Sequence, residues 1–161
     1  MELSDWLELV GNAASELAET ALGTVHVAFV RAPGHPPPEQ LQGVYLPMFS
    51  DGLALQLALL AEPEACVELA RQFLGLPAAE ELESEGLDVL GAFGNLIVGA
   101  LESRLGRRRE LRLGIPLALR GRAFAMGGAT SLEGVLEIDG APLYIVLSGA
   151  RSSARSAALR T

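Results

Sequence analysis

Two Asp-Gly pairs constrain the fold of this chain most strongly, because each one stands between two apolar runs. Ser50-Asp51-Gly52 separates residues 41–49 from 53–60, and Asp139-Gly140 separates residues 131–138 from 142–147. Asp-Gly is typical of two-residue hairpin turns, in which both central residues adopt positive φ. We therefore expect two tight β-hairpins and a largely antiparallel sheet.

The remaining periodic segments predict helices and further strands around these hairpins. Apolar residues recur at helical spacing in three stretches, 4–22, 63–75 and 84–106. β-branched and apolar residues predict strands over 24–32 and 111–125, the second interrupted by Pro116 and Gly121. This order predicts an α+β fold, in which an antiparallel sheet of about six strands packs against three helices.

An eight-residue pattern occurs twice in the chain, once in the first predicted helix and once in the third. Residues 5–12 and 88–95 both read Asp-x-Leu-x-x-apolar-Gly-Asn, and the two copies start 83 residues apart. Each copy precedes strands and a hairpin. We interpret this as an internal pseudo-duplication that spans the domain.

Length and composition predict a single packed domain. The chain has 161 residues, of which 50% are apolar, and a mean hydropathy of +0.32, enough to bury a sizeable core. We expect one domain over residues 1–150 and a flexible tail over 151–161, which is rich in Ser, Ala and Arg. A single cysteine, Cys66, rules out an internal disulfide, and two histidines are too few for a Cys/His zinc site.

Charge and hydropathy restrict the partners. Residues 1–102 carry a net charge of −14, and residues 103–161 carry +6, with arginine as the only basic side chain apart from two histidines. An isoelectric point near 4.7 argues against nucleic acid as the main partner. No apolar run reaches the roughly 18 residues of a membrane helix, and the acidic N-terminus does not resemble a signal peptide, so we expect a cytoplasmic protein without a membrane span.

The third predicted helix has a polar side that faces away from the core. One stripe is apolar, and the far side carries Asp88, Ala92, Asn95, Gly99 and Glu102. Asn and Gly both lower helix propensity. An amide flanked by two small residues leaves room for a partner, although a solvated Asn would give the same pattern.

These residues resemble the motif of the CheC, CheX and FliY chemotaxis phosphatases, and the layout is most similar to CheX-like proteins. The motif reads Asp or Ser, three residues, Glu, two residues, Asn, and then a Pro some twenty residues later. Asp88, Asn95 and Pro116 match it, and Gly99 follows as in many members. Ala92 occupies the position of the motif Glu, which is a departure from the family pattern.

The resemblance implies a function and a set of roles. Such proteins hydrolyse the aspartyl phosphate of a receiver domain such as phosphorylated CheY in two-component signalling, and magnesium is held by the receiver. By resemblance, Asn95 would be catalytic by orienting a water, and the phosphatase would need no cofactor or metal of its own. The binding side would comprise Asp88, Ala92, Gly99 and Glu102. CheX-like proteins are also expected to form homodimers through sheet edges, for which 111–125 is the candidate strand.

Three readings stay open at this point. The chain could be a phosphatase weakened by Ala92, a catalytically inactive binding module for a receiver or a motility-switch component, or a purely structural domain. The first helix offers a weaker second site at Asn12, where Glu8 lies four residues away and the family spacing is three. We expect that helix to present a solvated acidic face.

Overall fold

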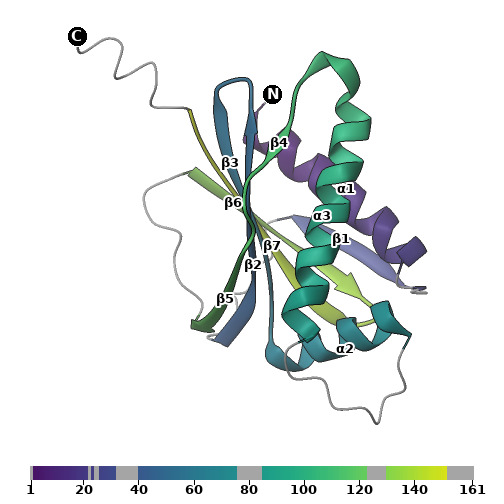
Figure 1. The fold of residues 1–161 in the computed structure, drawn as a ribbon. Coiled ribbons are helices and arrows are strands. Elements are labelled where there is room, and N and C mark those ends of the chain that lie inside the picture. Colours follow the sequence, from purple (N-terminus) through teal and green to yellow (C-terminus); the bar gives the residue numbers. More distant parts are fainter. Residues whose placement is uncertain are drawn as a thin grey trace.

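The computed structural model describes residues 2–21, 23, 26–31, 40–75, 85–122 and 130–151. The three predicted helices are confirmed to within one residue at each end: α1 (Leu3–Ala21), α2 (Pro63–Leu74) and α3 (Glu85–Leu105), which continues into a short 3₁₀ turn, η1 (Gly106–Arg108) (Figure 1). The strands are β1 (Val27–Arg31), β2 (Gln40–Ser50), β3 (Leu53–Ala61), β4 (Arg112–Leu113), β5 (Leu117–Arg122), β6 (Thr130–Ile138) and β7 (Ala141–Arg151). β7 includes Arg151, and the rest of the predicted tail lies outside the described residues.

The seven strands form one sheet in which every pairing is antiparallel. Both Asp-Gly hairpins are confirmed, between β2 and β3 and between β6 and β7. Asp51 and Gly52 have φ of 46° and 77°, and Asp139 and Gly140 have φ of 48° and 83°. These values are the positive φ pair that a type I′ turn requires.

The strand order supports the pseudo-duplication. The strands follow β1-β6-β7-β3-β2, and β4 and β5 both pair with the outer side of β2. Exchanging β1 with β5, β2 with β6 and β3 with β7 reverses this order and leaves it otherwise unchanged. The exchange therefore acts as a pseudo-twofold relation whose centre lies between β3 and β7.

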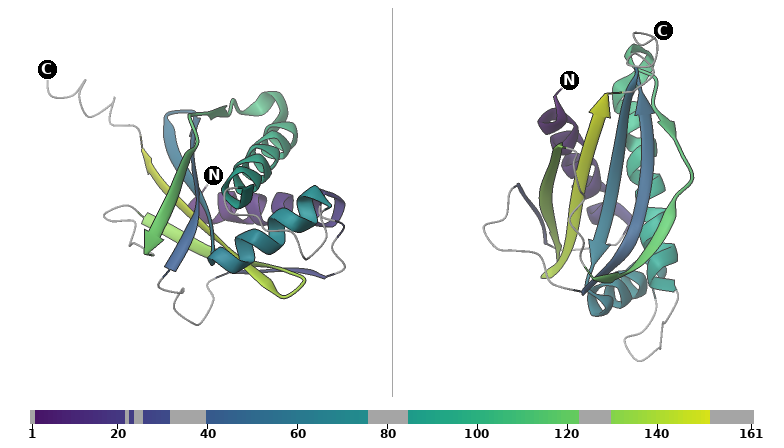
Figure 2. Two further views of the ribbon diagram at one scale, coloured as in Figure 1. Left: turned by 60° about the horizontal axis from the view of Figure 1, so that its bottom comes forward. Right: turned by 90° about the vertical axis from the view of Figure 1, so that its left-hand side faces the viewer.

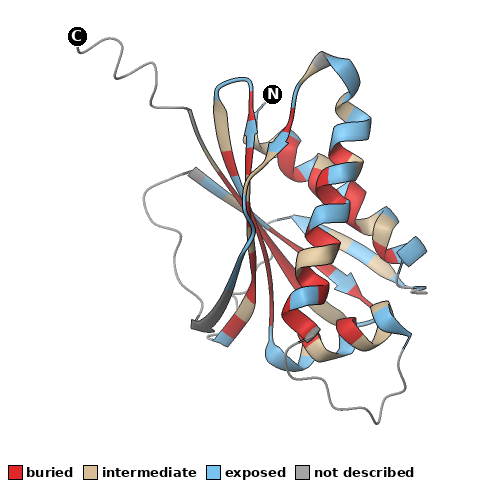
Figure 3. Ribbon diagram, viewed as in Figure 1, coloured by how far each residue is buried: buried red, intermediate tan, exposed pale blue. Residues whose placement is uncertain are grey.

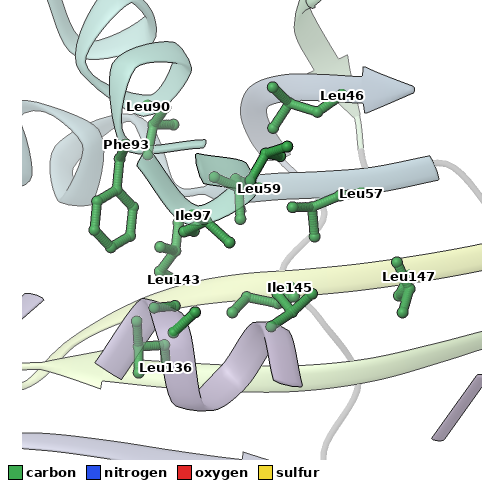
Figure 4. Close-up of a cluster of buried hydrophobic side chains, with 14 of the residues drawn as sticks. Leu46, Leu57, Leu59, Leu90, Phe93, Ile97, Leu136, Leu143, Ile145 and Leu147 are labelled. Atoms are coloured by element: carbon green, nitrogen blue, oxygen red, sulfur yellow. The ribbon is translucent and has the colours of Figure 1, made fainter. Parts of the chain in front are cut away.

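All three helices cover the same face of the sheet (Figure 2). The inward residues of the strands alternate along the chain, and Leu46, Leu57, Ile145 and Leu147 are each fully buried. Figure 4 shows how Leu90, Phe93 and Ile97 of α3 meet side chains from these strands in one apolar cluster. Complete burial of one such side chain contributes about 1.5–3 kcal/mol.

The predicted strand 111–125 is broken in two. β4 pairs with β2 so that Met48 lies opposite Leu113, whereas β5 pairs so that Tyr45 lies opposite Leu117. Three residues, 114–116, therefore stand opposite two, which is a β-bulge. The backbone N–H of Gly114 donates to the carbonyl of Pro47 at 2.7 Å. Further pairing stops because Pro47 and Pro116 both lack the N–H that a ladder needs.

One helix of the described residues, α3, is long and apolar enough over Gly86–Leu105 to cross a membrane by length and composition. The core helix of a folded domain passes the same test. In this fold the apolar stripe of α3 packs on the sheet and on α2, and the polar stripe faces solvent (Figure 3).

Candidate functional site

Gly94 fixes the position of α3 on the sheet. A Cβ atom added at this residue would overlap the side chain of Leu46, which is fully buried in β2. Only glycine lets the helix backbone approach β2 so closely at this point. Gly91 lies over Val44 of the same strand, so α3 runs along β2.

Asn95 is exposed and lies on the side of α3 that faces away from the other helices. Arg104 of α3 donates to a carboxylate oxygen of Glu16 in α1 at 2.5 Å, and Val89 packs against Ala70 of α2. Asn95 is nine residues from Arg104, and at about 100° per residue these side chains leave the helix in opposite directions. The amide of Asn95 therefore points toward the sheet edge formed by β4 and β5.

Small residues surround Asn95 on the helix surface. Ala92, one turn before it, is half-buried, and a Cβ atom added at Gly99, one turn after it, would meet no atom within 4 Å. Asp88 and Glu102 are exposed on the same side, each seven residues from Asn95 and thus about 10 Å along the helix. The predicted site residues do share one face, and the two carboxylates frame the amide at a distance of two helical turns.

The fold also brings Pro116 to the level of Asn95. Leu46 lies beneath Gly94, and the bulge of residues 114–116 stands opposite Leu46 and Pro47. Asn95 and Pro116 of the sequence motif, 21 positions apart, thus lie at the same level of β2, one on its helix side and the other at its edge. Sequence reasoning connected these residues only by resemblance.

Two exposed apolar side chains near this level were missed from the sequence. Leu96 is the large apolar residue of α3 with the greatest exposure, 42%, and Ile115 in the bulge is 81% exposed. The signal for Ile115 was present in the run Gly114-Ile115-Pro116, which interrupts a strand. This run indicates an exposed bulge only once it is known that Pro47 of β2 stands opposite it.

The first helix carries the other copy of the repeat. Gly11 packs against the ring of Phe29 in β1, and Asn12 is exposed beside Glu8 and Glu16. Glu16 is engaged by Arg104 of α3. The expected acidic face of α1 is confirmed, since Asp5, Glu8, Glu16 and Glu19 are all exposed.

The chemistry of the α3 site is that of a positioned amide. An Asn side chain donates two hydrogen bonds and accepts others, so it can hold and orient a water molecule. Within the described ranges, no three His, Cys, Asp or Glu side chains are grouped as a metal site would require. Cys66 is fully buried, and burial raises the pKa of its thiol, so it acts as a core residue.

Comparison with known proteins gives a family match over more than half of the chain. A family model described as chemotaxis phosphatase CheX matches residues 46–136, which include α3 and the bulge. No curated protein matches the sequence significantly.

Several solved structures share the fold at low sequence identity. A chemotactic CheC-like protein from Shewanella oneidensis is similar with a TM-score of 0.70 at 13% identity, covering 89% of this chain and 96% of that one. CheX in a CheX–CheY–BeF3–Mg2+ complex from Borrelia burgdorferi gives a TM-score of 0.69 at 15% identity, with 91% and 97% covered. FliY from Thermotoga maritima gives 0.56 at 15% identity, with 94% and 88% covered.

Proposed function

This chain belongs to the family of the chemotaxis phosphatase CheX, and we propose that it acts on the aspartyl phosphate of a response-regulator receiver domain of the CheY type. The observation that carries this proposal is the placement of Asn95. The amide is exposed, flanked by Ala92 and the open Gly99, and held in register by the contact of Gly94 with Leu46. A partner surface can approach it without displacing any large side chain.

The proposed reaction is hydrolysis by a water molecule that Asn95 orients. The water oxygen attacks phosphorus in line with the bond to the aspartyl oxygen, that bond breaks, and inorganic phosphate and the free carboxylate form. The contribution of this chain is positioning, since its nearest carboxylates on α3, Asp88 and Glu102, lie about two helical turns away. We place the magnesium of this reaction in the receiver, as the resemblance implies, and assign no cofactor to this chain.

Ala92 sets the expected strength of the activity. The family motif has Glu here, which pairs with a lysine of the receiver, and a methyl group cannot replace that charge. Removal of one partner of a buried charge pair costs about 2–5 kcal/mol. We therefore propose a weakened phosphatase, in which Asp88, Ala92, Gly99 and Glu102 form the docking side around Asn95.

The second candidate is a catalytically inactive module that binds a receiver domain or a motility-switch component. Ala92 is the observation that favours this candidate, because a protein that no longer hydrolyses the phosphate can lose the docking Glu of the motif. The two candidates share the same docking side and differ only in whether phosphate is released.

We further propose that the protein is cytoplasmic and belongs to a two-component chemotaxis pathway.

We also propose that the chain forms a homodimer through the sheet edge at β5. β5 lies at the edge and pairs with β2 on one side among the described strands. An edge strand with unpaired backbone groups is a ready template for a second copy. Light scattering that gives the mass of one chain at micromolar concentration would contradict the dimer.

The experiment that tests the function measures phosphate release from receiver domains encoded in the same genome. Each receiver is phosphorylated with a small-molecule phosphodonor in the presence of magnesium, and its decay is followed with and without this protein. Faster decay supports the phosphatase. Unchanged decay with saturable binding supports the inactive module, and the absence of both for every receiver contradicts the proposal.

A further inference from the structure

Ile115 protrudes from the sheet edge beside the candidate site. It is 81% exposed, the largest exposure among the large apolar side chains of the described residues. Exposure of this size has a local cause. The prolines at positions 47 and 116 cannot donate to the ladder, and the one-residue offset between β4 and β5 places Ile115 in the bulge.

The position of Ile115 relative to Asn95 follows from contacts and registers. Gly94 packs on Leu46, and the residues opposite Leu46 and Pro47 are those of the bulge. Asn95 is directed away from α1 and α2, toward the edge at which the bulge lies. Figure 1 shows the chain leaving α3 and returning as β4 and β5 along this edge.

The two surfaces together have a definite chemical character. The α3 side contributes the amide of Asn95, the methyl group of Ala92 and the carboxylates of Asp88 and Glu102, and the edge contributes the aliphatic side chain of Ile115. The whole helical layer is acidic, with seven more acidic than basic residues over α1, α2 and α3. A partner that fits here has a basic rim and an apolar side chain near its centre.

We infer that Ile115 is a specificity-determining docking residue, which gives the receiver domain an apolar contact beside Asn95 where a charge at position 92 is lacking. The inference rests on the proposed function and names the chemistry of its partner. A receiver suited to this chain presents an aliphatic or aromatic side chain opposite Ile115, with basic residues facing Asp88 and Glu102.

The test measures binding of the full chain to a CheY-type receiver of the same genome, activated with beryllofluoride and magnesium. Ile115→Ser removes the apolar contact, and we expect an affinity loss of roughly tenfold or more, as burial of an aliphatic side chain implies. Ile115→Leu should retain most of the affinity. Val30→Ser is the matched control, because Val30 is also exposed, at 50%, but lies in β1 at the opposite edge of the sheet. It should change the affinity less than twofold.

The outcomes separate this inference from the function on which it rests. A loss with Ile115→Ser alone, with thermal unfolding unchanged, supports the docking role. Equal affinities for wild type and Ile115→Ser overturn the inference and leave the phosphatase proposal standing, provided that the wild type binds the receiver. If the wild type binds no receiver of the genome, the proposed function fails, and the docking role of Ile115 fails with it.

Discussion

α1 and α3 carry the same eight-residue pattern, and each contacts the sheet through the glycine of that pattern. The two helices nevertheless present different surfaces to solvent. Gly11 packs on Phe29 and Gly94 on Leu46, so in each copy the glycine allows close approach of the helix. The amides at positions 12 and 95 are both exposed. In both copies of the repeat, the glycine packs the helix against the sheet and the Asn that follows it faces solvent.

The difference lies in what surrounds each amide. Asn12 stands between Glu8 and Glu16, and Glu16 is tied to α3 by Arg104. Asn95 stands between Ala92 and Gly99, and the space beside Gly99 is open.

The sheet edges beneath the two helices differ as well. α1 packs on the edge strand β1 as well as on β6, whereas α3 rests on β2 and makes no comparable contact with β4 or β5. The edge beside α3 is therefore free to take part in binding. In the proposed function α3 is the binding element, and it is the copy of the repeat beside which the sheet edge makes little contact with a helix.

The largest expected effect separates the two amides directly. Asn95→Ala should lower receiver dephosphorylation by about 10²-fold or more, because a group that positions the attacking water is lost. Asn12→Ala should leave the rate unchanged. Phosphate release measured at equal protein concentrations checks this, and equal losses in both variants would show that the two helices act alike.

A second substitution restores the residue that α3 lacks. Ala92→Glu should raise the rate several-fold or more, because docking to the receiver lysine is regained. Adding Asn95→Ala to this variant should remove the gain. If Ala92→Glu improves binding of the activated receiver without any phosphate release, the inactive module becomes the better description.

The glycines of α3 should respond in opposite directions. Gly94→Ala pushes a methyl group into the buried Leu46, and overpacking of this kind costs about 1–3 kcal/mol of unfolding free energy. Gly99→Ala meets no neighbour and should stabilise the helix by about 0.5–1 kcal/mol. Urea unfolding of both variants measures the difference. A stabilised Gly94→Ala protein would refute the close approach of α3 to β2.

The smallest effect concerns the link between the two helices. Arg104→Ala removes the ion pair with Glu16, whose side chain is 71% exposed, so we expect a loss of less than about 1 kcal/mol of stability. The rate of dephosphorylation should stay the same. A large loss of stability would show that this pair contributes more than an exposed ion pair should. New activity that depends on Asn12 would show that the pair holds α1 in an inactive arrangement.

The sequence by itself determined the local elements and much of their arrangement. Three features depend only on residues close together in the chain: the Asp-Gly turns, the amphipathic helices and the repeated Asp-x-Leu-x-x-apolar-Gly-Asn pattern. Backbone φ preference predicts the turns, and helical periodicity predicts the helices. The exposed side of α3, with Asp88, Asn95 and Glu102, follows from the same periodicity.

Only the tertiary structure decided which residues lie next to the exposed side of α3. The break depends on Pro47 of β2 standing opposite the bulge that contains Pro116, and these two prolines are 69 positions apart in the chain. The contact of Gly94 with Leu46 and the ion pair between Arg104 and Glu16 also join residues that are far apart in the chain. Strand register and helix packing are set by the whole core, so the exposure of Ile115 next to Asn95 could not be obtained from either segment alone.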